Sequence, residues 1–318
     1  MSKVKPKKNQ ESIRDGFGIG LLEAGNMNTN VVALTADLKD STRCDSFAKK
    51  FPSRFYDIGI AEQNMMSVAA GMAKMGKIPF VNSFAVFSPG RNWDQLRVSV
   101  CYQNMNVKIH GSHAGLSAGA DGATHQALED IAITRVLPNL VVLVPCDTNE
   151  AKNAVIAAAE YKGPVYIRTS KSKVPLLTKK DLKFKIGVAK ILKRGTDVTI
   201  VCCGVMVHRV LSAVGKLKRL GISSEVINCP TIKPLDEQTI LKSVSKTKKI
   251  VSVEEHQRIG GLGSAIAELV IEKNPVPMRI IGINNTFGES GKDSELLDNY
   301  GLSIDDIFLS VKNFLKKY

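Results

Sequence analysis

The amino-acid sequence predicts an α/β protein built from two parallel sheets that are covered by helices. Two observations support this fold class. Short apolar runs alternate with helical patterns along the 318 residues, which is typical of parallel strands joined by crossover helices. A hydrophobic content of 44% gives a chain of this length enough apolar surface for a large core, and the length favours two domains.

The first domain is predicted over residues 1–175. Its strands are expected from the apolar runs at 31–37, 78–84, 106–111, 140–145 and 164–170. A helix is expected after Asp147, since Asp147, Thr148 and Asn149 offer N-terminal caps. The residues Ala151, Ala154, Val155 and Ala158 then share one helical face.

Residues 176–190 are predicted to be a linker, because they are rich in lysine and show no helical period. They are expected to lead into an edge strand. The second, smaller domain is predicted over 191–318, with strands at 197–204, 223–230, 248–255 and 278–283 and helices near 208–220 and 262–272.

The composition narrows the possible environments and partners. No run of about 18 apolar residues is present, and the lysine-rich start "MSKVKPKKNQ" is not followed by an apolar signal segment, so we expect a cytoplasmic protein. The six cysteines form no C-x-x-C pair, which favours reduced, packed thiols. A net charge of +14 would attract anionic ligands such as small phosphates. The lysines are scattered along the chain, however, so no nucleic-acid or membrane partner is expected.

A carboxylate, Glu62, stands where the strand-like piece "YDIGIA" meets a helix of small and thioether side chains. One interpretation is structural, because an acidic residue in a first helical turn complements the helix dipole. The other is functional and requires a ligand that needs one carboxylate at the bottom of an apolar cleft. These residues alone leave both interpretations open.

The segment "HGSHAGLSAGADGATHQALED", residues 110–130, contains four glycines, two of which flank Asp121 closely. It follows a predicted strand, where ligands bind in α/β folds. Taken singly, Asp121 is explained by a local turn and His125 by a helix cap. His110 and His113 stand three residues apart without a third ligand, so no metal site is expected.

Several motifs resemble, in order and spacing, those of the transketolase and 1-deoxyxylulose 5-phosphate synthase group of thiamine-diphosphate enzymes. They are "ADLKDS" (36–41), "GIAEQNMMSVAAGMA" (59–73), "VNSFAVFS" (81–88), "GADGATHQ" (119–126), "GPVYIRTSKS" (163–172) and "VSVEEHQRIGGLGSAIAE" (251–268). The resemblance covers nearly the whole chain. It implies a pyrimidine-binding domain with a parallel sheet, followed by a transketolase carboxy-terminal domain.

The resemblance also implies roles for individual residues. Glu62 would hydrogen-bond N1′ of the cofactor's aminopyrimidine and promote formation of the carbanion that attacks a ketose. Phe84 and Phe87 would pack on the pyrimidine ring, and Asp37 would also contact the cofactor. Without the resemblance, the two phenylalanines would be assigned to the core.

Further residues match positions that bind the sugar. Asp121 and His125 would contact the sugar hydroxyls and assist proton transfer. The expected phosphate contacts are Ser41, His113, Arg168 and Lys171. Two positions depart from the family pattern: Lys171 stands where an arginine is usual and offers no bidentate fork, and Ala123 stands where proline is common.

The family's amino-terminal domain, which binds the diphosphate and a divalent metal through a "GDG" segment, has no counterpart in this sequence. The resemblance therefore implies the carboxy-terminal subunit of a two-subunit transketolase. Its amino-terminal partner would bind Mg²⁺ or Ca²⁺, and a dimer of heterodimers is expected. The reaction would be transfer of a two-carbon ketol unit from a ketose phosphate to an aldose phosphate.

Three alternatives stay open from the sequence. Two keep the fold and change the reaction, namely a 1-deoxyxylulose 5-phosphate synthase-like subunit and the beta subunit of a 2-oxo acid dehydrogenase. The "ADGATHQ" loop argues against the dehydrogenase, and the single-chain organisation of the synthase argues against that enzyme. The third is a non-catalytic regulatory subunit, which would have no need to keep Glu62, Asp121 and His125 together.

Overall fold

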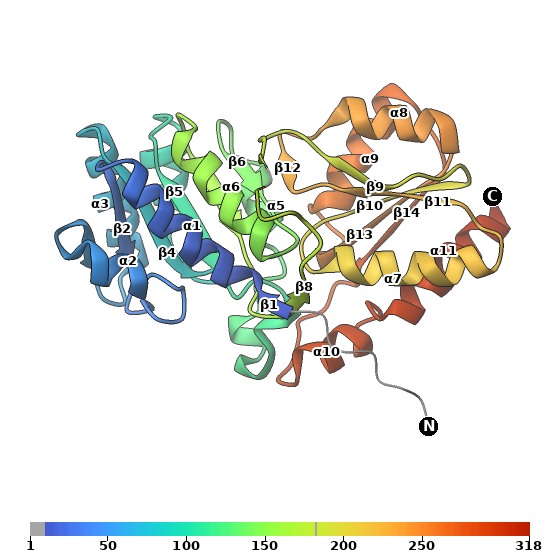
Figure 1. The fold of residues 1–318 in the computed structure, drawn as a ribbon, viewed down its shortest axis with the longest axis horizontal. Helices are drawn as coiled ribbons and strands as arrows, with labels where there is room; N and C mark the ends of the chain where they lie inside the picture. Colours follow the sequence, from blue (N-terminus) through green and yellow to red (C-terminus); the bar gives the residue numbers. More distant parts are fainter. Residues whose placement is uncertain (1–9, 182) are drawn as a thin grey trace.

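The computed structural model describes residues 10–181 and 183–318. Within these ranges the chain forms two α/β halves, which lie side by side in Figure 1. The predicted α/β class with mostly parallel sheets is confirmed.

The first half is built on a seven-stranded sheet with the strand order β12-β6-β7-β5-β4-β2-β3. Strands β2 to β7 pair in parallel throughout, while β12 pairs antiparallel with β6. The strands are β2 (Val31–Thr35), β3 (Phe55–Asp57), β4 (Ile78–Phe84), β5 (Lys108–Ser112), β6 (Val141–Leu143), β7 (Val165–Arg168) and β12 (Thr231–Lys233).

Helices cover both faces of this sheet, and strand β2 shows why both faces are apolar. Val31 and Ala33 pack in the core cluster that contains residues of α1 (Ile13–Met27) and α6 (Thr148–Glu160). Val32 and Leu34 pack in the cluster on the opposite face, which contains residues of α3 (Glu62–Lys74) and of the π-helical segment η2 (Leu96–Cys101). A strand buried on both sides is a continuous apolar run, as the sequence shows. Short helices complete this half: α2 (Asp45–Lys50), η1 (Pro52–Arg54), α4 (Trp93–Gln95) and α5 (Asp130–Arg135).

The second half is built on a five-stranded sheet with the order β14-β13-β10-β11-β9. The strands are β9 (Lys190–Lys193), β10 (Val198–Cys202), β11 (Ser224–Asn228), β13 (Ile250–Gln257) and β14 (Met278–Ile283). Figure 1 shows α7 (Met206–Arg219) and α11 (Ile304–Lys317) along one face, and α8 (Glu237–Thr247) and α9 (Leu262–Lys273) along the other. The remaining helix of this half, α10 (Asp293–Asn299), lies toward the first half.

Most elements predicted from the sequence are present. Each predicted strand overlaps an observed strand, the strand-like piece at 56–61 overlaps β3, and Asp147 caps α6 by accepting a hydrogen bond from the backbone N–H of Glu150. Three short strands were not predicted. These are β12, β1 (Gln10–Ser12) and β8 (Lys173–Pro175), the last two of which pair with each other.

The two halves are connected by an edge strand and by a common apolar cluster. Strand β12 follows the second sheet's β11 in sequence but adds an edge strand to the first sheet. One apolar cluster also joins them, since it contains Val142 of the first sheet and Ile227 of the second.

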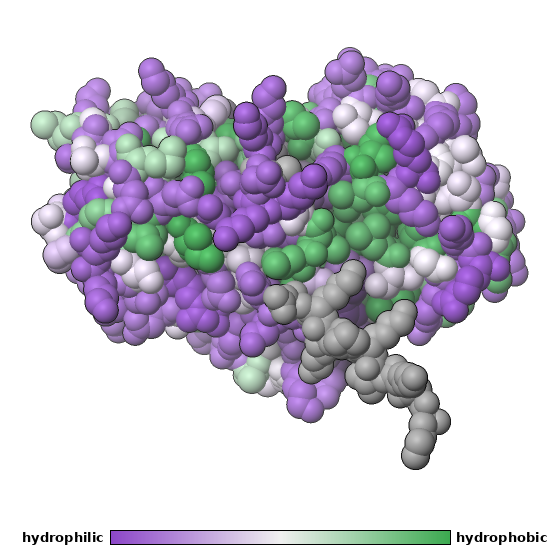
Figure 2. All heavy atoms as spheres, viewed as in Figure 1, coloured by the Kyte–Doolittle hydropathy of each residue, from purple (hydrophilic) through white to green (hydrophobic). Residues whose placement is uncertain are grey.

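The molecular surface is mixed. The face shown in Figure 2 is largely hydrophilic and carries a hydrophobic area over the second half. Within residues 10–181 and 183–318, no helix is both long and apolar enough to cross a membrane.

Candidate functional site

The residues predicted to bind cofactor and sugar gather at one edge of the first sheet. They lie beyond the carboxyl-terminal ends of its parallel strands, where ligands bind in open α/β sheets. The predicted residues follow strand ends in this way: Asp37 and Ser41 after β2, Glu62 after β3, Phe84 and Phe87 at and after β4, His113 after β5, and Lys171 after β7.

Glu62 is the first residue of α3 and is only 4% exposed. Its carboxylate accepts hydrogen bonds from Nη1 of Arg91, at 3.0 Å to Oε1 and 3.2 Å to Oε2. The Arg91 side chain itself is 48% exposed. Glu62 therefore lies at the floor of the site, and its charge partner lies at the rim.

Aromatic rings are connected to this carboxylate through Arg91. The rings of Phe84 and Phe87 are nearly parallel, with centroids 5.9 Å apart and an interplanar angle of 17°. The guanidinium of Arg91 lies 3.9 Å from the centroid of Phe87. The imidazole of His125 packs edge-to-face with Phe87, with ring centroids 5.2 Å apart. The contacts thus connect Glu62 to His125 through Arg91 and Phe87.

His113 links the aromatic residues to the basic part of the site. Its ring lies 3.9 Å from that of Phe84. Nε2 lies 2.9 Å from Nη1 of Arg14, which can only donate, so Nε2 accepts and the proton of the neutral ring is on Nδ1. Nδ1 lies 2.9 Å from the hydroxyl of Ser112 and donates to it. Burial, reinforced by the nearby Arg14, lowers the pKa of His113 to about 3.

Arg14 joins the site although the sequence did not predict it there. It lies in the first turn of α1, and the same Nη1 also donates to the backbone carbonyl of Ser41 at 2.9 Å. Burial and the nearby Arg43 lower the pKa of Arg14 from its ordinary value. Nothing in the local sequence "SIRDG" marks this arginine, because an arginine early in an amphipathic helix is ordinary. Only the packing of α1 against the strand ends brings it to His113.

The remaining predicted residues occupy the outer part of the site. Nζ of Lys171 lies 3.4 Å from a carboxylate oxygen of Asp121, and both side chains are partly exposed. Asp37 is exposed in the left-handed region, with φ of 56°, and its backbone N–H donates to Asp57. Ser41 is half-buried.

Arg168 differs from the other predicted phosphate contacts. It is 5% exposed, and its Nε donates to Asp130 at 2.8 Å. Its Nη2 donates to the backbone carbonyls of Ala127 and Glu255. The guanidinium is therefore committed to a buried ion pair within the first half and to a backbone carbonyl of the second half. We leave Arg168 out of the phosphate site for this reason.

His110 is also absent from this cluster. It is buried, its ring stacks on Phe17 at 3.4 Å, and its Nε2 pairs with the hydroxyl of Thr169. Within the described ranges, no group of three or more His, Cys, Asp or Glu residues is arranged to hold a metal ion. All six cysteines are buried and unpaired, as the sequence predicted.

Comparisons with known proteins agree with this fold and site. The family model for the transketolase pyrimidine-binding domain matches residues 10–175, and the model for the transketolase C-terminal domain matches 187–307. A 6-deoxy-6-sulfo-D-fructose transketolase subunit of Clostridium sp. is 40% identical, with 93% of this chain and 92% of that protein covered. An apulose-4-phosphate transketolase subunit of Phocaeicola vulgatus is 38% identical, with 97% and 99% covered.

A solved structure is similar over nearly its full length. It is described as a split gene transketolase in an inactive beta4 tetramer, is 45% identical, and has a TM-score of 0.90, with 96% of this chain and 98% of that chain covered. The chain therefore belongs to the transketolase family.

Proposed function

We propose that this chain is the carboxy-terminal subunit of a two-subunit transketolase, which moves a two-carbon ketol unit from a ketose phosphate to an aldose phosphate. The observation that carries the proposal is the cluster of Glu62, Phe87 and His125 at the strand ends of a transketolase-family domain. The near-complete coverage of relatives that are named as transketolase subunits supports the subunit assignment.

The residues at the floor of the site fit the aminopyrimidine of thiamine diphosphate. Such a ring needs a carboxyl group at one edge and an apolar face beside it. Glu62 supplies a buried carboxylate, and the half-buried ring of Phe87 supplies the face. When bound, thiamine diphosphate would supply the nucleophilic carbon that cleaves a ketose and carries the two-carbon unit.

The chain's own residues would then perform three tasks. Glu62 would hold the pyrimidine edge in the protonation state that lets its amino group exchange a proton. Asp121 and His125 would hydrogen-bond the sugar hydroxyls. The aromatic side chains would keep water away from the reacting atoms.

The basic part of the site would hold the sugar phosphate. We propose Arg14, His113, Ser41 and Lys171 as its contacts, with Arg14 in the place that the sequence prediction gave to Arg168. Arg14 supplies a fixed positive charge, and His113 is held neutral with its Nε2 toward Arg14. A phosphate would compete with His113 for the Arg14 donor, which couples phosphate binding to the position of His113.

We further propose that an amino-terminal partner completes the site by binding the diphosphate through Mg²⁺ or Ca²⁺, in a dimer of heterodimers. The split gene relative supports the need for a partner, because its beta chains alone form a tetramer described as inactive.

The test is a mild affinity purification of tagged chain from its own host, followed by assay of the eluate with thiamine diphosphate. Xylulose 5-phosphate, apulose 4-phosphate and 6-deoxy-6-sulfo-D-fructose are offered as donors, because relatives are named for the last two. We expect cofactor-dependent transfer to ribose 5-phosphate or to glyceraldehyde 3-phosphate from at least one donor, together with a second co-purifying chain. A complex that binds thiamine diphosphate yet transfers from none of these donors would overturn the proposal.

A further inference from the structure

The loop that carries Asp121 and His125 is attached to the second half of the chain. It comprises the 3₁₀ segments η3 (Leu116–Asp121) and η4 (Ala123–His125), both of which follow β5 of the first sheet. At its start, the backbone N–H of Ser117 donates to Oε1 of Glu255 at 2.7 Å. The Ser117 hydroxyl lies 2.9 Å from the carbonyl oxygen of Ala114 and 3.3 Å from Oε2 of Glu255. Glu255 lies on β13, an interior strand of the second sheet.

From this contact we propose that Glu255 is a positioning residue for the sugar site, through which the second domain sets the place of Asp121 and His125. The inference rests on the proposed function, because it takes those two residues as the sugar contacts. Glu255 itself touches neither of them. It acts through the backbone of the loop.

The backbone at the start of the loop is shaped to the Glu255 carboxylate. Gly115 has φ of 84°, in the left-handed region, and a Cβ atom there would lie 2.3 Å from the carboxyl carbon of Glu255. Any other residue would push the loop away from the carboxylate. Gly115 also donates its N–H to the carbonyl of Ala127, which brings the two ends of the loop together.

The chemistry of Glu255 indicates a specific role rather than filling of the core. It is 3% exposed, and burial, opposed by the neighbouring Arg168, raises its pKa to about 7. Burying a carboxyl group costs free energy that an apolar side chain of similar size would avoid. Here Oε1 accepts the backbone N–H of Ser117, Oε2 lies within hydrogen-bond distance of the Ser117 hydroxyl, and Arg168 donates to the backbone carbonyl of Glu255.

A second contact holds the far end of the loop from the same domain. The side-chain amide of Gln126 donates to the carbonyl of Glu289 at 2.9 Å and to that of Gly119 at 3.2 Å. A Cβ atom on Gly288 would collide with the carbonyl oxygen of this amide, at 1.9 Å. The loop is thus clamped at Ser117 and at Gln126, on either side of Asp121.

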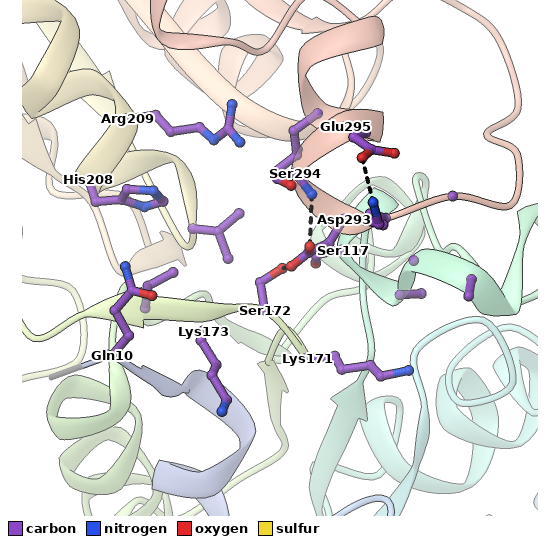
Figure 3. Close-up of a pocket in the computed structure, with 18 residues that line it drawn as sticks. Gln10, Ser117, Lys171, Ser172, Lys173, His208, Arg209, Asp293, Ser294 and Glu295 are labelled. Carbon is purple, nitrogen blue, oxygen red and sulfur yellow. Dashed lines mark hydrogen bonds and ion pairs between the residues drawn. The ribbon is translucent and has the colours of Figure 1, made fainter. Parts of the chain in front are cut away.

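The loop also borders a cleft. Residues 117–120 form one wall of a cleft of about 890 Å³ between the halves, and residues 171–174 and 291–295 form others. Figure 3 shows Ser117, Lys171, Ser172 and Asp293 around this cleft, with the Ser172 hydroxyl donating to Asp293 at 2.7 Å. Segment η3 also packs against α10, so the second half holds the loop by packing as well as by the hydrogen bonds to Glu255.

The neighbouring residue offers a matched control. Glu254 is also fully buried, and its pKa is likewise raised to about 7 by burial. It accepts two backbone N–H groups at 2.7 Å, from Leu262 and Gly263 at the start of α9. Both of these donors belong to its own domain, so Glu254 has the same chemistry as Glu255 without the bond to the loop.

The experiment compares Glu255→Ala, Glu255→Gln and Glu254→Ala in the complex with the amino-terminal partner. Steady-state kinetics give kcat and KM for the ketose, titration gives the Kd for thiamine diphosphate, and hydrogen–deuterium exchange follows residues 113–126. For Glu255→Ala we expect a KM raised about tenfold or more and faster exchange in that segment, with the cofactor Kd within about twofold.

The other two variants have different expected results. Glu255→Gln is expected to keep the KM and the exchange rate much closer to wild type than Glu255→Ala does. Its amide oxygen accepts from the Ser117 N–H, and its NH₂ group donates to the Ser117 hydroxyl. Glu254→Ala lowers the melting temperature but leaves the KM and the exchange of 113–126 near wild type. If Glu255→Ala changed KM and exchange no more than Glu254→Ala does, the inference would be wrong. Absence of transfer by the wild-type complex would count against the proposed function instead, and the exchange comparison would still decide whether Glu255 holds the loop.

Discussion

The guanidinium of Arg91 joins Glu62 to Phe87. Its Nη1 lies 3.0 Å from Oε1 of the carboxylate, and its central carbon lies 3.9 Å from the centre of the aromatic ring. Arg91 follows β4 whereas Glu62 begins α3, so one cation fixes the relative positions of two segments of the proposed cofactor site. The sequence predicts Glu62 and Phe87 as separate cofactor contacts and does not predict that Arg91 joins them.

Replacing Glu62 by glutamine is expected to lower ketol transfer by about 100-fold or more, because the amide cannot serve as the acid–base partner of the pyrimidine. The melting temperature should stay close to wild type, since the half-exposed Arg91 can be hydrated when its partner is neutral. Turnover of the assembled complex and thermal unfolding of the chain are the two measurements. Glu237→Gln, which changes an exposed acid in the first turn of α8, is the matched control. Normal turnover of Glu62→Gln would remove Glu62 from the mechanism.

Arg14→Ala should raise the KM for phosphorylated donors by about tenfold or more and leave kcat within a fewfold, because a lost charge-assisted hydrogen bond weakens binding of the phosphate. The same variant should use an unphosphorylated ketose about as well as wild type does. Kinetics with both kinds of donor make the test, and Arg279→Ala, at an exposed arginine of β14, is the control. An equal loss with both donors would contradict the assignment to phosphate.

Arg168→Met is expected to lower the free energy of unfolding by about 3–5 kcal/mol, because it leaves the buried carboxylate of Asp130 without its ion-pair partner. The double variant Arg168→Met with Asp130→Leu should recover part of this loss, since no unpaired charge is then buried. Urea unfolding of the two variants and of wild type measures the effect. A stable Arg168→Met chain with only a raised KM for sugar phosphates would restore the phosphate role predicted for Arg168 from the sequence.

His113 makes the stability of the chain depend on pH in a defined direction. Its pKa is lowered from the ordinary 6.5 to about 3 in the folded protein, so between these values the unfolded chain binds a proton that the folded chain does not. Stability is therefore lost as the pH falls through this window. Below pH 6.5, the free energy of unfolding of wild type should fall by about 1 kcal/mol per pH unit relative to that of His113→Gln. Urea unfolding of both proteins at pH 7, 5.5 and 4.5 gives the difference, and a difference that does not change with pH would contradict the shift.

The central strands of both halves could be predicted because each is a buried apolar run whose length and flanking turns are visible in the sequence. Strand β12 could not be predicted in the same way. It has only three residues, and it is defined by pairing with β6, which lies far earlier in the chain. Such an edge strand depends on a tertiary contact that local pattern does not record.

Tertiary contacts that local sequence does not reveal also decide the composition of the candidate site. The motifs near strand ends indicate Glu62, Phe84 and His125. In the structure the rings of Phe84 and His125 are neighbours, and Arg91 connects Glu62 to the adjacent Phe87. The sequence does not indicate Arg14 and favours Arg168 at the phosphate, because local sequence does not reveal where the long side chain of an arginine points. The fold sends Arg14 to His113 and directs Arg168 inward to Asp130.

The pairing of β12 with β6 affects how this protein can be divided. A fragment that ended at residue 175 would lack β12, and the outer edge of β6 would then expose unpaired backbone groups that can template aggregation. Val142 would also lose the neighbours that the second half contributes to its apolar cluster. We therefore expect gene fragments that follow the boundary between the halves to give a poorly soluble first half, and the two halves to melt as one cooperative unit.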